Sequence, residues 1–209
     1  MRKNLEVKEL DSRQLDDYFA FFDDLYETDP WLNSRDNPWW SGCYCGFFDD
    51  ARSEQELMAL GARELRRMRI ERIRVHRAHG FLAYLGGKVV GWCNAGPRAS
   101  YVSFHHLSRA VEEDPNEPVG SILCFVVASL YRRMGVATAL LQSACASFKH
   151  SGLSYAEGYP RIKPANVDNP YNIPEAHLNY YGPLNMYLKA GFKMHRQFDK
   201  FVAVRKDLR

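Results

Sequence analysis

The segment with the clearest chemical content lies past the middle of the chain, where an apolar run gives way to the pattern Arg-x-x-Gly-x-Ala at Arg132–Ala137. Small residues at Gly135 and Ala137 allow a ligand to approach the backbone closely. The first amides of a helix are unpaired donors that attract phosphate. The pattern therefore favours a pyrophosphate site, although an ordinary strand-to-helix turn with an arginine-rich surface would produce the same pattern.

The residues around this segment predict a βαβ unit that would position it. Val119–Val127 is continuously apolar, as expected of a central strand buried on both faces. Apolar residues after the loop recur at helical spacing until Gly152 ends the helix, and Leu153–Tyr159 follows as the next strand. The loop would then lie between a buried strand and the start of an amphipathic helix.

The rest of the chain predicts further elements from periodicity, capping boxes and turn residues. In chain order they are a strand at 5–10, a helix from Asp11 to Tyr26, one long helix from Ser53 to His79, a hairpin at 81–94 around Gly86 and Gly87, a short helix at 184–190, and two strands within 192–204. The segment at about 29–50 is an aromatic-rich loop insertion. We expect residues 1–209 to form a single domain.

Composition limits the classes of partner. The chain has 209 residues, of which 46% are hydrophobic, so it can bury a core. A net charge of +3 is too small to predict nucleic acid as the main partner. The first ten residues alternate charged and apolar side chains, unlike a signal peptide or a membrane span, so we expect a cytoplasmic protein without a membrane segment.

Two further patterns have simple explanations that we prefer to functional ones. Cys43 and Cys45 could bind a metal, but no second pair with zinc-ligand spacing accompanies them, so we predict free thiols and no metal. Seven arginines of the long helix could form a strip for an acidic partner or nucleic acid. Because Glu64 and Glu71 interleave with them, a solvated face is the preferred interpretation.

A second motif, Tyr-x-x-x-Gly-Phe at Tyr187–Phe192, follows the loop by about 50 residues. Together with Arg132–Ala137 and the order of elements, it resembles the GNAT superfamily of N-acetyltransferases, over roughly residues 1–204. The resemblance implies an α/β fold with a central, bent mixed sheet flanked by helices. It also implies transfer of an acetyl group from acetyl-CoA to a primary amine by direct attack.

The resemblance also assigns roles to particular residues. The main chain of Phe125, Val126 and Val127 would pair with the pantetheine arm, and Tyr187 would act as general acid towards the departing thiolate. The pyrophosphate would be held by the amides of Arg132, Arg133, Met134, Gly135, Val136, Ala137 and Thr138.

This chain departs from the family at one position, where Tyr180 replaces an asparagine found in many members seven residues before the tyrosine. Asn179 is our preferred substitute for the contact to CoA, ahead of Asn185. The general base is open. Glu157 is our named candidate, the alternatives being Glu117, His105, His106 and proton release to water.

The acceptor, a small-molecule or peptide amine, is not identified by these patterns. The aromatic segment Trp31–Phe48 could line an acceptor site, or its rings could complete the core or a contact in a homodimer. The main alternative function is a non-catalytic acyl-CoA sensor or scaffold. The others are transfer of a longer acyl chain and nucleic-acid binding by the arginines.

Overall fold

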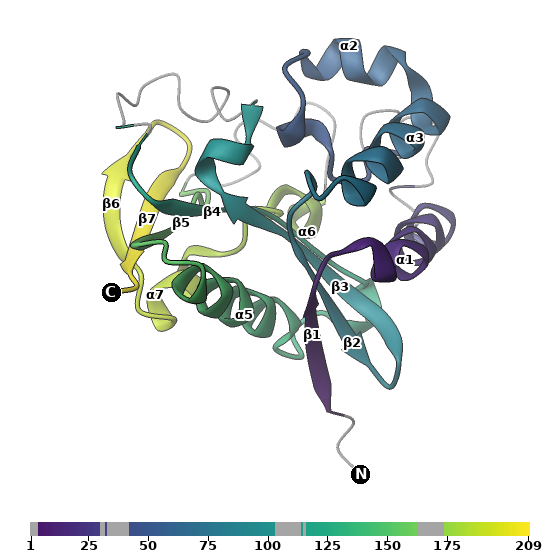
Figure 1. Cartoon of the computed structure of the whole chain (residues 1–209). Helices are drawn as coiled ribbons and strands as arrows, with labels where there is room; N and C mark the ends of the chain where they lie inside the picture. The colour runs from purple at the N-terminus through teal and green to yellow at the C-terminus, as the bar shows by residue number, and fades with distance from the viewer. Residues whose placement is uncertain (1–3, 30–31, 33–41, 103–113, 115, 163–173) are drawn as a thin grey trace.

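The computed structural model describes residues 4–29, 32, 42–102, 114, 116–162 and 174–209. The strands in these ranges are β1 (Leu5–Glu9), β2 (Phe81–Leu85), β3 (Lys88–Pro97), β4 (Val119–Val127), β5 (Tyr155–Gly158), β6 (Lys193–Gln197) and β7 (Val202–Asp207). They form one seven-stranded sheet in the order β1-β2-β3-β4-β5-β7-β6 (Figure 1). Neighbours are antiparallel except β4 and β5, which run parallel.

Helices cover both faces of this sheet. The α-helices in the described ranges are α1 (Leu15–Thr28), α2 (Glu54–Ala59), α3 (Gly61–Arg74), α5 (Val136–His150), α6 (Glu175–Leu178) and α7 (Leu184–Lys189). Figure 1 shows α5 and α7 on one side of the sheet and α1, α2 and α3 on the other. The crossover that a parallel pair requires is supplied by α5, which connects β4 to β5. A mixed α/β sheet flanked by helices confirms the predicted fold class.

Local signals in the sequence place several of these elements correctly. Asp11 and Ser53 each begin a capping box, and α2 starts directly after Ser53. The hairpin between β2 and β3 turns at Gly86 and Gly87, whose φ angles are +63° and +82°. Positive φ at both central residues is the requirement of a type I′ turn, which explains the glycine pair.

The single helix predicted over residues 53–79 is wrong, because the structure has two helices there. The first ends at Ala59, and the second begins at Gly61. Gly61 has φ +76°, which no continuous α-helix allows, and the Leu60 amide donates to the Leu57 carbonyl at 3.1 Å in a tighter closing turn. The apolar spacing continues across this break, so periodicity alone could not reveal it.

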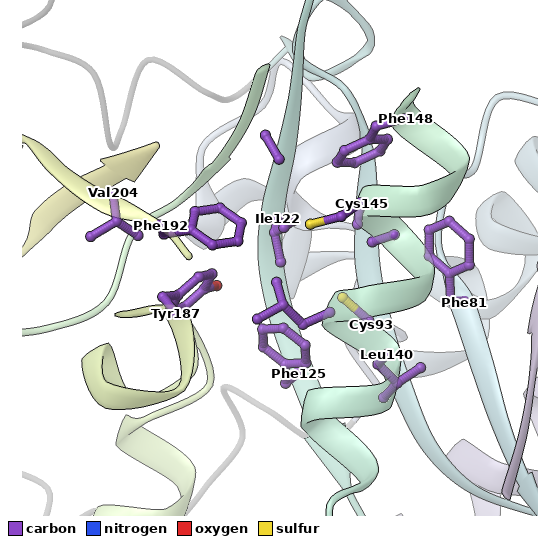
Figure 2. Packing of buried hydrophobic residues seen from close by; sticks show 14 of the residues in the cluster. Phe81, Cys93, Ile122, Phe125, Leu140, Cys145, Phe148, Tyr187, Phe192 and Val204 are labelled. Atoms are coloured by element: carbon purple, nitrogen blue, oxygen red, sulfur yellow. The ribbon is translucent and has the colours of Figure 1, made fainter. Parts of the chain in front are cut away.

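The largest buried cluster lies between the sheet and the helices α5 and α7. Figure 2 shows Tyr187, Phe192 and Val204 grouped beside Ile122 and Phe125 of β4. A separate buried cluster lies on the opposite face, where α1 supplies most of the aromatic rings. Within the described ranges, every helix is too short or too polar to cross a bilayer.

Candidate active site

The loop predicted to bind phosphate connects β4 to the start of α5. Arg133 and Gly135 have φ angles of +64° and +86°, and Gly135 immediately precedes the helix. The first bond inside α5 runs from the Ala139 amide to the Gly135 carbonyl at 3.0 Å. The amides without a partner in the helix are therefore those of Val136, Ala137 and Thr138. Left-handed residues beside a helix N-terminus form a concave array of N–H groups that suits a phosphate.

The side chains of this loop differ in their surroundings. Arg132 is half-buried, and its Nε donates to the Val127 carbonyl at 3.1 Å. One of its terminal nitrogens lies 3.8 Å from the buried Asp29 carboxylate. Arg133 and Met134 are exposed. Arg132 therefore ties the loop to the end of β4, whereas Arg133 is exposed.

The strands β4 and β5 separate beside this loop. Their parallel pairing ends at Ile122 and Gly158, while β4 continues to Val127 and stays paired with β3. The register with β3 skips Leu123, which places a β-bulge on β4 at the point of separation. Beyond it, the Phe125 amide donates to the Tyr180 carbonyl at 2.6 Å. Among the described residues, the part of β4 predicted to meet pantetheine thus has no strand partner on its β5 side.

Tyr187 is fully buried on α7 beside this stretch of β4 (Figure 2). Its ring meets the Phe192 ring edge-on at 5.1 Å and the Phe125 ring at 6.4 Å. The hydroxyl donates to the Tyr181 carbonyl at 2.8 Å. A Cβ added at Gly158 would lie 2.2 Å from a ring carbon, so only glycine leaves room for this ring. Burial raises the pKa of Tyr187 well above its usual range, which keeps the phenol protonated.

Glu157, the candidate base, is fully buried on the face of β5 away from α5. Arg205 Nε donates to it at 2.6 Å, the Tyr159 hydroxyl at 3.0 Å, and an Arg98 nitrogen lies 3.4 Å away. Arg205 also pairs with Glu117 at 2.6 Å. Both carboxylates therefore belong to one ion-pair network that joins β5 and β7, and the structure does not bring Glu157 to the phenol of α7.

The remaining predicted site residues fall in two groups. Asn179 is half-buried and its carbonyl accepts the Gly182 amide at 2.8 Å, while Asn185 is exposed in the first turn of α7. Outside the described residues lie His105, His106, Trp31, Trp39 and Trp40.

A buried ion pair on the α1 side of the sheet was missed by the sequence analysis. The side chains of Arg69 and Asp49 are 1% and 2% exposed and form an ion pair, and Arg69 Nε donates to the Tyr18 hydroxyl at 3.0 Å. The prediction of a solvated arginine face is therefore wrong for Arg69, because a carboxylate 20 residues earlier compensates its charge. Nothing in the spacing of the arginines distinguishes this one.

The five cysteines are free thiols. Hydrogen bonding to Cys45 and burial hold the pKa of the Cys124 thiol well above its usual range, and burial has the same effect on Cys93. The same hydrogen bond, donated by Cys124, lowers the pKa of Cys45. A protonated thiol is a poor nucleophile, so neither Cys124 nor Cys93 suits covalent catalysis. Among the residues that the structure describes, no three His, Cys, Asp or Glu side chains gather as metal ligands would.

Solved structures with a similar fold include several acetyltransferases. The acetyltransferase of GNAT family from Streptococcus pneumoniae matches with a TM-score of 0.51 and 15% identity, over 98% of this chain and 99% of that one. N-acetyltransferase from Staphylococcus aureus matches with a TM-score of 0.50 and 15% identity, over 99% of both chains. PaiA N-acetyltransferase from Thermoplasma acidophilum, solved in complex with coenzyme A, gives 0.51 and 13%, over 98% and 99%. At these identities the likeness concerns the fold.

No curated protein sequence is a significant match to the chain. A family model described as acetyltransferase (GNAT) family matches residues 11–161, which include β4, the loop at Arg132–Ala137 and β5. This match confirms the resemblance inferred from the two motifs. The chain therefore belongs to the GNAT family and is an acetyl-CoA-dependent N-acetyltransferase.

Proposed function

We propose that this protein transfers the acetyl group of acetyl-CoA to a primary amine by direct attack, with no covalent enzyme intermediate. One observation carries the proposal most directly. The unpaired amides at the start of α5 follow, after the short turn Ser129–Tyr131, the stretch of β4 that is not paired with β5. A diphosphate and the extended chain attached to it need these two features in this order.

The binding role rests mainly on backbone groups. The Arg132 amide, predicted to be one of the phosphate donors, instead donates to the Ser129 carbonyl at 3.3 Å. The amides from Arg133 to Thr138 would hold the pyrophosphate, and Phe125–Val127 would pair with the pantetheine arm as an added strand. Arg132 would act on the pyrophosphate indirectly, since its guanidinium holds the loop against Val127. The exposed Arg133 would add a charge-assisted contact.

For the chemical step, we assign the polarisation of the thioester carbonyl to the Phe125 amide. This assignment is supported by the 2.6 Å bond from that amide to a carbonyl oxygen of the chain itself. Tyr187 would donate its proton to the departing thiolate, in agreement with a phenol that burial keeps protonated. We assign removal of the amine proton to water rather than to Glu157, because arginines and a tyrosine engage its carboxylate.

Calorimetric titration with acetyl-CoA, followed by thiol release in the presence of a panel of primary amines, tests this function. Arg132→Glu combined with Gly135→Trp should abolish binding. Tyr187→Phe should retain binding and lower kcat by roughly 10²- to 10⁴-fold, the range of general acid catalysis. Failure of the folded wild type to bind acetyl-CoA would refute the proposal. Binding without turnover of any amine would favour the sensor or scaffold.

A further inference from the structure

A short turn of the chain covers the edge of β4 beyond Ile122, where β4 no longer pairs with β5. After Gly158 the backbone follows β7 rather than β4, since the Val202 amide donates to the Pro160 carbonyl at 3.0 Å. The space beside β4 is taken instead by the turn Asn179–Gly182, which connects α6 to α7. We call this segment the 179–182 turn.

Two consecutive carbonyls of the 179–182 turn accept hydrogen bonds from the two groups to which we assign the chemistry. The Tyr180 carbonyl accepts from the Phe125 amide at 2.6 Å. The Tyr181 carbonyl accepts from the Tyr187 hydroxyl at 2.8 Å. The first bond uses the donor assigned to the thioester carbonyl, and the second uses the proton assigned to the thiolate. The turn and acetyl-CoA therefore compete for the same donors.

The Tyr180 ring anchors the turn on the α1 side of β4, and the backbone of Gly182 lies close to Phe125 on the α5 side. The rings of Tyr180 and Tyr181 lie 4.1 Å apart, and Tyr180 packs against the cluster covered by α1. Gly182 has φ +83°, and a Cβ there would lie 3.1 Å from the Phe125 ring and 2.8 Å from the end of Met186. The turn thus passes from the α1 face to the α5 face through the separation between β4 and β5.

From this geometry we propose that the 179–182 turn closes the acetyl-CoA site in the free protein, and that it must leave β4 before the pantetheine arm can pair there. The inference rests on the proposed function. The turn and the ligand compete for β4, so the apparent affinity of the ligand is reduced in proportion to the fraction of molecules whose site is open. If the turn is open in about one molecule in ten, the apparent Kd is about tenfold weaker than that of the open form.

Substitutions that loosen the turn should therefore tighten binding. Tyr180→Ala removes the ring contact, and Gly182→Ala places a methyl group against the Phe125 ring in a strained backbone. Each should lower the Kd for acetyl-CoA about tenfold in calorimetry. Leu188→Ala, at an exposed position on α7, is the control and should leave the Kd unchanged.

Hydrogen exchange on the wild type gives a second measurement that needs no variant. Saturating acetyl-CoA should increase exchange in peptides that cover the 179–182 turn. Weaker binding in both variants, or greater protection of the turn in the complex, would overturn the closure while leaving acetyl-CoA binding intact. If neither the wild type nor the folded variants bind acetyl-CoA, the proposed function fails, and the closure fails with it.

Discussion

Two glycines at opposite ends of α5 allow the phosphate loop to be tested against a matched control. Gly135 precedes the helix with φ +86°, and Gly152 follows it with φ +78°. Both are exposed, and a Cβ added at either would have nothing within 4 Å. Replacement by alanine therefore introduces backbone strain at both sites without a steric clash. The two variants should therefore differ only in acetyl-CoA binding, because only Gly135 lies in the proposed phosphate loop.

The magnitude of this strain follows from the left-handed conformation, which costs an L-residue roughly 1–2 kcal/mol. For a chain of this size, each kcal/mol lowers the Tm by about 2–4 °C. Gly135→Ala and Gly152→Ala should therefore both melt roughly 2–8 °C below the wild type. A thermal melt of each variant measures this shared cost.

Binding of acetyl-CoA should separate the two variants. In Gly135→Ala, relief of the strain rotates the amides that open α5, and we expect a Kd about tenfold weaker, which corresponds to about 1.4 kcal/mol. Gly152→Ala should bind as the wild type does in the same calorimetric titration. Gly135→Asn should recover part of the affinity, because asparagine tolerates the left-handed region. Equal affinity in both alanine variants, with equal losses of Tm, would refute the assignment of the loop.

Three further predictions concern buried groups. Asp49→Ala leaves the Arg69 charge buried without its partner and should cost about 3–5 kcal/mol in urea unfolding, whereas a loss below about 1 kcal/mol would show that the pair contributes little. A hydrogen bond from Arg52 lowers the pKa of Asp50 to about 2, so on acidification the unfolded chain takes up that proton first. The resulting stabilisation of the folded state, at most about 2 kcal/mol, is present above about pH 4 and is lost towards pH 2. Asp50→Asn should therefore flatten the dependence of the unfolding free energy on pH between these values. An unchanged slope in the variant would contradict the assignment of the lowered pKa to Asp50. Gly158→Ala displaces the buried tyrosine of α7, so kcat should fall at least about tenfold while calorimetry shows acetyl-CoA binding retained.

Much of the fold could be predicted because its signals are local. The capping box at Ser53, the Gly86-Gly87 turn and the buried run of β4 each report the conformation of a few adjacent residues. The phosphate loop belongs to the same class, since its conformation depends on a glycine at the start of a helix. The break at Gly61 was missed because one left-handed residue hardly changes the apolar spacing on either side.

In the candidate site, too, residue types could be predicted from the sequence, whereas their contacts could not. The motif around Tyr187 identified a tyrosine, but its burial against Phe192 and its bond to the Tyr181 carbonyl depend on how α7 packs. Glu157 was the named candidate base, but the fold of β7 brings Arg205 to its carboxylate from 48 residues away. The charge and type of each residue could be read from the sequence, whereas its hydrogen-bond and ion-pair partners could not.

By itself the sequence determined the order of the strands, the glycine-containing phosphate loop and membership of the family, because each depends on short-range spacing. Only the tertiary structure decided that β5 ends beside Ile122, that Arg69 is buried, and that Tyr180 meets the amide of Phe125. These contacts join residues tens of positions apart. Their formation depends on how the elements pack against the sheet, which no local pattern of residues encodes.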